Sequence, residues 1–208
     1  MIDSSTALLV IDVQNDFCPG GSLTVPKGDE IIAPINAMAK RFENIILTQD
    51  WHTPGHASFA STHPGKKPFE IVQMFYGPQV LWPDHCIMGS KGAEFHPGLD
   101  IPTAQTVIRK GYRQPVDSYS GFLEADRKTP TGLGAYLKER GVSRVVLVGL
   151  ATDFCVNWTA TDARKFGLET FVVDDACRAI DAMGSLAKAW DAMNAAGVKK
   201  IKIADLPA

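Results

Sequence analysis

Short apolar runs rich in β-branched residues recur along the chain, and each run is continuous rather than alternating with polar residues. Continuous runs of this kind are typical of strands that are covered on both faces of a sheet. The predicted strands span residues 7–13, 44–49, 106–109, 144–150, 169–173 and 199–204.

Between most of these runs, apolar residues recur every three or four positions, as they do on the buried face of a helix. Gly141, Gly167 and Gly197 follow three of these segments, at the place where a helix commonly ends. Strands therefore alternate with helices, which predicts an α/β fold with a mostly parallel six-stranded sheet and helices on both faces. The predicted helices carry their apolar faces at residues 31–42, 133–137, 156–163 and 186–193.

The segment from about 51 to 102 breaks this rhythm, because it is rich in His, Pro, Gly and aromatic residues and has no sustained period. Long irregular insertions in compact domains are usually functional. The sequence shows no internal repeat and no domain linker, so we expect one domain over residues 1–208 that carries this insertion.

Composition narrows the class of protein and its partners. The chain has 208 residues, of which 45% are hydrophobic and 21% charged, with a formal net charge of −2. This is the usage of a globular protein, and no basic face is available to bind nucleic acid. No stretch approaches the roughly 18 apolar residues of a membrane span, and the N-terminus does not resemble a signal peptide. We therefore expect a cytoplasmic protein without a membrane partner, in which Cys18, Cys86, Cys155 and Cys177 are free thiols.

Four reactive side chains stand at the ends of four successive predicted strands. Asp12, Asp50 and Lys110 close or follow the first three strands, and Cys155 lies just past the fourth. Ligands of open α/β sheets bind beyond the carboxyl ends of the strands. Singly, each residue has an ordinary interpretation as a turn aspartate, a solvated lysine or a buried thiol. Together they indicate an active site.

The position of Cys155 suits a nucleophile. If a helix begins near Thr152, its free N–H groups and dipole stabilise a thiolate and can face an oxyanion. A buried, inert thiol is the alternative interpretation of the same segment.

The insertion contains a set of candidate metal ligands. Asp50 and His52 are two positions apart and can point the same way in an extended segment, while His85 offers a third ligand. His56 is a candidate additional ligand. A hydrogen-bonded Asp–His pair without metal is the alternative.

The chain also resembles a known family over nearly its whole length. The order and spacing of several motifs are similar to those of the nicotinamidase branch of the isochorismatase-like cysteine hydrolases, also called pyrazinamidases. The Asp-x-His run together with Trp-Pro-x-His-Cys is particular to that branch. The motifs are VIDVQNDF at 10–17, QDWH at 49–52, WPDHC at 82–86, RKG at 109–111, VDSYSGF at 116–122 and GLATDFCV at 149–156.

The resemblance implies a catalytic triad of Asp12, Lys110 and Cys155 on a Rossmann-type three-layer fold. It also implies an oxyanion hole formed by the backbone N–H groups of Ala151 and Cys155, and a cis peptide bond before Ala151. Asp12 would take the thiol proton, and Lys110 would favour the thiolate.

By the same resemblance, one divalent metal ion binds Asp50, His52 and His85, with zinc expected first and iron or manganese as alternatives. The implied reaction hydrolyses nicotinamide to nicotinate and ammonia through a thioester, as in NAD salvage, and extends to pyrazinamide. The implied substrate-binding residues are Phe17, Trp82 and Tyr119. The partners would be small molecules, and a homo-oligomer is compatible with the sequence.

Two other functions fit part of the pattern. A cysteine hydrolase of the same fold that acts on a carbamoyl, ureido or hydrazide substrate would not need the metal ligands. A zinc-binding or thiol-redox protein without catalysis would use the cysteines as ligands or sensors, but the chain has no Cys-x-x-Cys pair. The sequence leaves open the metal, the role of His56 and the oligomeric state.

Overall fold

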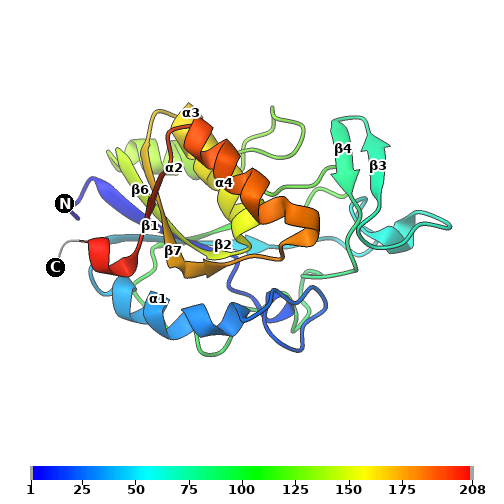
Figure 1. Ribbon diagram of the computed structural model, residues 1–208, viewed down its shortest axis with the longest axis horizontal. Coiled ribbons are helices and arrows are strands. Elements are labelled where there is room, and N and C mark those ends of the chain that lie inside the picture. The colour runs from blue at the N-terminus through cyan, green and yellow to red at the C-terminus, as the bar shows by residue number, and fades with distance from the viewer. Residues whose placement is uncertain (1, 207–208) are drawn as a thin grey trace.

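The computed structural model describes residues 2–206, which form a parallel six-stranded sheet with helices on both faces (Figure 1). The strand order is β5-β2-β1-β6-β7-β8, and every neighbouring pair in this sheet is parallel. The α/β prediction is therefore confirmed. The strands are β1 (Thr6–Ile11), β2 (Asn44–Asp50), β5 (Thr106–Lys110), β6 (Arg144–Leu150), β7 (Glu169–Arg178) and β8 (Lys199–Ile201), and the helices are α1 (Ile32–Ala39), α2 (Leu133–Glu139), α3 (Asn157–Lys165) and α4 (Ser185–Ala195).

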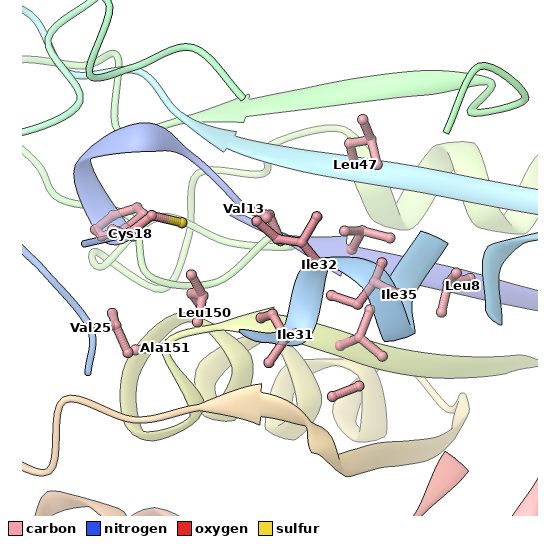
Figure 2. Close-up of a cluster of buried hydrophobic side chains, with 14 of the residues drawn as sticks. Leu8, Val13, Cys18, Val25, Ile31, Ile32, Ile35, Leu47, Leu150 and Ala151 are labelled. Carbon is pink, nitrogen blue, oxygen red and sulfur yellow. The ribbon is translucent and has the colours of Figure 1, made fainter. Parts of the chain in front are cut away.

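Successive residues of β1 belong to two different cores, as the two-residue repeat of a strand requires. Leu8 and Val10 pack in the cluster that includes α1, whereas Leu9 and Ile11 pack in the cluster that includes α2, α3 and α4. Helix α1 accordingly lies on one face of the sheet and the other three helices on the opposite face (Figure 1). Figure 2 shows the first cluster, where Ile32 faces the sheet.

The two edge strands depart from the prediction of strands covered on both faces. In β5 only Lys110 is buried, and Val107 is 41% exposed. In β8 none of the three residues is buried. Both strands have a neighbour on one side only, so side chains at these edges reach solvent even in a parallel sheet.

The insertion is less irregular than its sequence suggests. It contains an antiparallel hairpin, β3 (Ile71–Met74) and β4 (Gly77–Val80), which stands apart from the main sheet at one end of the molecule (Figure 1). This hairpin was not predicted from the sequence. Each strand has only four residues, and Pro78 and Gly77 disfavour strand formation, so no sustained period was visible.

Close backbone approach explains one glycine beside the site. A Cβ on Gly149 would lie 2.1 Å from the Ile11 carbonyl oxygen, and Gly149 has a φ of +118°. A larger residue would push β1 and β6 apart where both strands end. Across residues 2–206, no helix has both the length and the apolar character to cross a membrane.

Candidate active site

The strand order places the four strand-end residues at neighbouring positions, because β5, β2, β1 and β6 are consecutive in the sheet. Lys110 lies at the centre. Its Nζ is 2.8 Å from Asp12 Oδ2 and 3.4 Å from Cys155 Sγ, and it donates a hydrogen bond to the Ser118 carbonyl at 3.0 Å. It also donates to Asp50 Oδ1. The Lys110 side chain is fully buried, and a buried lysine charge is rare unless it is paired with carboxylates, so its role is not to make the surface soluble.

Thr48 fixes the orientation of the Asp12 carboxylate. The Thr48 hydroxyl donates to Asp12 Oδ1 at 2.6 Å and accepts the Asp12 backbone N–H at 3.2 Å. Asp12 Oδ2 is thereby left to face Lys110. Sequence reasoning missed Thr48, which reads as an ordinary buried strand residue.

Cys155 lies in a π-helical turn, Thr152–Val156, that leads into α3. The Ala151 carbonyl accepts hydrogen bonds from the backbone N–H groups of Phe154 and Val156, both at 3.1 Å. The Leu150–Ala151 peptide bond is cis, as the family resemblance implies. The thiol therefore sits at the N-terminal end of a helix, as predicted.

The pKa of the Cys155 thiol is governed by burial more than by the nearby lysine, so the group is not a simple lysine-stabilised thiolate. Burial raises the pKa of the Cys155 thiol well above its ordinary value; Lys110 opposes the rise and the Asp12 carboxylate adds to it. Burial alone would lower the pKa of Lys110, but the carboxylates of Asp12 and Asp50 outweigh burial and raise it. Both shifts favour a thiol on Cys155 beside a charged Lys110. Burial raises the pKa of Asp12 as well, and Lys110 opposes that rise.

Asp50, His52 and His85 offer one ligand atom each, and these atoms lie within 4.8 Å of one another. Hydrogen bonds orient both imidazoles. His85 Nδ1 is 2.8 Å from the Pro83 carbonyl oxygen, and donation there leaves the lone pair of Nε2, which is 3.8 Å from Asp50 Oδ2. His52 Nε2 is 3.3 Å from Asp117 Oδ1, while the buried His52 Nδ1 has no hydrogen-bond partner in the described part of the chain. Free ring nitrogens whose opposite nitrogens are anchored in this way fit a divalent metal ion.

Both ring nitrogens of His56 have hydrogen-bond partners other than Asp50, His52 and His85. Its Nδ1 is 2.8 Å from the Ser58 hydroxyl, and its Nε2 is 3.1 Å from the Arg113 carbonyl oxygen and 3.3 Å from that of Val116. Burial, followed by the nearby His52, lowers the pKa of His56 to about 4, so the ring is neutral. Both ring nitrogens are used by the protein, and this arrangement argues against His56 as an additional ligand.

The candidate metal ligands Asp50, His52 and His85 line one cavity together with Cys155. Phe17, Trp82 and Tyr119, the predicted substrate-binding residues, all line it. The Trp82 indole N–H donates to the Tyr119 hydroxyl at 2.8 Å, and the Phe154 ring stands perpendicular to Trp82 at 4.8 Å. The complete lining is Phe17, Leu23, Asp50, His52, Trp82, His85, Asp117, Tyr119, Ala151, Phe154, Cys155 and Ile180.

Leu23, Phe154 and Ile180 were not predicted to line the cavity. Phe154 directly precedes the candidate nucleophile, and this position was the available signal. Leu23 and Ile180 carry no motif, and apolar residues belong to the core far more often than to a binding site.

Comparison with known proteins agrees with this architecture. The Isochorismatase domain model matches residues 6–205, so the chain belongs to the isochorismatase family. Within that family it groups with the nicotinamidases: it is 58% identical over 198 residues to the nicotinamidase of Acinetobacter baylyi, with 95% of this chain and 92% of that protein covered.

Solved structures show the same relationship. The nicotinamidase–pyrazinamidase of Acinetobacter baumannii has a TM-score of 0.98 at 57% identity and covers 99% of both chains. A protein of L. infantum in complex with nicotinate has a TM-score of 0.87 at 38% identity, covering 100% of this chain and 98% of that one. The pyrazinamidase of Pyrococcus horikoshii in complex with zinc has a TM-score of 0.78 at 34% identity, covering 96% and 99%.

Proposed function

We propose that this protein is a nicotinamidase, which hydrolyses nicotinamide to nicotinate and ammonia through a thioester on Cys155, and that it also converts pyrazinamide to pyrazinoate. One observation carries the proposal: Cys155, Lys110 and Asp12 form a contiguous buried triad at a cavity whose walls are aromatic and which also contains Asp50, His52 and His85. The nicotinate-bound and zinc-bound relatives support the substrate class and the metal.

The triad geometry suggests the order of proton transfers. Asp12 takes the Cys155 proton as sulfur attacks the carboxamide carbon, and Lys110 stabilises the negative charge that forms. The N–H groups of Ala151 and Cys155 would hold the tetrahedral oxyanion. The C–N bond then breaks, and Asp12 gives its proton to the departing ammonia. Water, deprotonated by Asp12, attacks the thioester; the C–S bond breaks and releases nicotinate and the thiol.

Asp50, His52 and His85 would hold one divalent ion, and zinc is the first choice because its ligands are commonly imidazole and carboxylate. A bound ion there would supply a Lewis acid that holds the pyridine nitrogen, directly or through water. The aromatic rings of Phe17 and Trp82 would keep the pyridine plane aligned with the Cys155 sulfur.

The cellular setting follows from the same proposal. We place the enzyme in NAD salvage in the cytoplasm, where the four buried free cysteines would stay reduced. Residues 1–208 would act as a single domain around one continuous sheet.

The test is direct. Purified protein is incubated with nicotinamide, ammonia and nicotinate are both measured, and an acid-quenched sample is examined by mass spectrometry for a nicotinoyl adduct on Cys155. Cys155→Ala should lose turnover and the adduct, whereas Cys177→Ala, which removes a buried thiol in β7 away from the cavity, should retain both. Near wild-type turnover by Cys155→Ala would overturn the covalent mechanism.

A further inference from the structure

Gln79 connects the hairpin to the interior of the site. It lies in β4 and is only 1% exposed, unlike most of the hairpin. Its Nε2 is 2.8 Å from Asp117 Oδ2 and 2.9 Å from the Tyr119 hydroxyl. Neither the motifs nor the proposed reaction assigns this residue a role.

The neighbours of Gln79 fix which way its amide points. Nε2 is also 2.7 Å from the Val80 carbonyl oxygen, so three oxygen atoms surround the nitrogen. Oε1 accepts a hydrogen bond from the Tyr76 hydroxyl at 3.1 Å. Rotating the amide by 180° would place an oxygen against a carboxylate and a carbonyl, which is repulsive. The site therefore requires a donor at this position.

One branch of the contacts leads to the metal ligands. The two carboxylate oxygens of Asp117 have different partners. Oδ1 accepts a hydrogen bond from the Ser118 N–H at 2.8 Å and faces His52 Nε2 at 3.3 Å, whereas Oδ2 accepts one from Gln79. Gln79 thus holds the carboxylate in the rotation that presents Oδ1 to His52. That contact in turn directs His52 Nδ1 to the ligand position.

The other branch leads to the aromatic walls. The Tyr119 hydroxyl accepts from both Gln79 and the Trp82 indole N–H, and Tyr119 and Trp82 both line the cavity. The Gln79 amide therefore contacts Asp117, which orients the candidate metal ligand His52, and Tyr119, which orients the aromatic wall of the cavity.

We propose that Gln79 is a positioning residue that aligns His52 for metal binding through Asp117 and aligns the substrate ring through Tyr119. The alignment of the substrate ring rests on the proposed function, whereas the alignment of His52 concerns metal binding alone. Because Gln79 touches neither the metal position nor the triad in this arrangement, it should affect affinity more than the chemical step.

The experiment compares Gln79→Met with Gln73→Met. Both positions are glutamines of the same hairpin, but Gln73 is exposed, and within residues 2–206 its side chain donates a hydrogen bond only to the neighbouring Met74 carbonyl, at 3.1 Å. Methionine keeps the length of the side chain and removes the amide. Each protein is loaded with Zn²⁺ or Co²⁺, and the metal affinity is measured by competition with a chromophoric chelator. Steady-state kinetics with nicotinamide give KM and kcat separately.

For Gln79→Met we expect metal affinity to fall by up to about 10-fold, because loss of a direct partner of a metal ligand costs about 10- to 100-fold and Gln79 acts on His52 only through Asp117. The visible spectrum of bound Co²⁺ should change, and KM should rise by a larger factor than kcat falls. Gln73→Met should match wild type. Gln79→Glu, which places a carboxylate against Asp117, should weaken metal binding at least as much. Because glutamate matches glutamine in size, this variant shows whether the hydrogen-bond donor or the volume of the Gln79 side chain matters.

Wild-type metal affinity and KM in Gln79→Met would overturn the inference, as would equal losses in Gln73→Met. Circular dichroism of the metal-free proteins shows whether the variants fold. A wild-type protein that bound metal but did not hydrolyse nicotinamide would refute the proposed function, while the metal competition would still decide the role of Gln79.

Discussion

Lys110 Nζ lies 3.4 Å from Cys155 Sγ, although the two residues are 45 positions apart and two strands separate β5 from β6, the strand that precedes Cys155. The contact exists because Lys110 ends the edge strand β5 and its long side chain extends toward the ends of β2, β1 and β6. Its ammonium group contacts the Asp12 and Asp50 carboxylates as well as the thiol.

Removal of either charged partner of Cys155 should slow the chemical step. We expect Asp12→Asn and Lys110→Ala to lower kcat by about 10²–10⁴-fold, the range of positioned acid–base groups. Iodoacetamide should also alkylate Cys155 more slowly in Lys110→Ala than in wild type at neutral pH, because the lysine opposes the raised pKa of the thiol. Lys138→Met on exposed α2 surface is the control. Equal alkylation rates would refute activation by the lysine charge.

Thr48→Val should impair the base without changing the volume of the site. Loss of a hydrogen bond to a charged group costs about 1.5–3 kcal/mol, which corresponds to a decrease in kcat/KM of roughly 10- to 150-fold. Burial raises the pKa of Asp12, and Lys110 and the Thr48 hydrogen bond oppose the rise, so loss of the Thr48 hydroxyl should move the acid limb of the kcat/KM profile to higher pH. Thr48→Ser should restore most of the rate. A profile that does not move would show that Thr48 serves packing alone.

The metal should orient the ring and not activate water, because the nucleophile is sulfur. Benzamide, which has no ring nitrogen, should be a poor substrate, whereas pyrazinamide should be hydrolysed. Chelation, or His52→Ala with His85→Ala, should depress nicotinamide turnover strongly and change the weak benzamide rate little. If the chelated enzyme kept its original preference for nicotinamide over benzamide, Asp50, His52 and His85 would serve structure instead.

His56 should contribute to folding and not to metal binding. Its nitrogens bond to Ser58 and to the carbonyls of Arg113 and Val116, so His56→Ala should lower the free energy of unfolding by about 1–3 kcal/mol. The metal content of the folded variant should equal that of wild type, whereas His85→Ala should lose the metal. Loss of metal from folded His56→Ala, measured by atomic emission, would make His56 a ligand.

Glu124 should make stability fall as the pH rises. Burial raises the pKa of its carboxyl from 4.5 to about 7, with Arg113 opposing the rise. The folded protein then holds a proton that the unfolded chain releases, so this contribution is fully present below about pH 4.5 and is lost as the pH rises through about 7. Its size is on the order of 2–3 kcal/mol.

Glu124→Gln should therefore flatten the dependence of the unfolding free energy on pH between about 4.5 and 7, measured with urea, while exposed Glu94→Gln should not. Identical slopes in Glu124→Gln and wild type would assign the effect to other groups.

The sequence predicted the central strands well because their residues are buried on both faces, as in β1, β2 and β6. It did not predict the exposure of β5 and β8, because position at the edge of a sheet depends on strand order, which no single segment contains. The Asp12, Lys110 and Cys155 cluster was predictable from strand ends and motif resemblance.

The supporting residues were not predictable in the same way. Gln79 contacts Asp117 across 38 positions, but from the sequence its amide looks like that of an ordinary exposed glutamine, and Thr48 lies within an apolar run. Whether a histidine keeps a ring nitrogen free for a metal depends on its hydrogen-bond partners: the Asp117 carboxylate faces His52, the Pro83 carbonyl faces His85, and both nitrogens of His56 are occupied. That information is three-dimensional and leaves no pattern along the chain.

The bond from Lys110 to both Asp12 and Asp50 bears on attempts to engineer this centre. The same ammonium group balances the carboxylate proposed as the base and the carboxylate proposed as a metal ligand, so the two functional groups are not separable modules. A designer who transplanted only the Asp50, His52 and His85 ligands into another scaffold would bury an aspartate without its counter-charge. A designer who kept the thiol chemistry but deleted the metal ligands would leave Lys110 with half of its anionic surroundings. Transfer of either activity to another scaffold therefore requires the ends of β5, β2, β1 and β6 to be grafted as one unit.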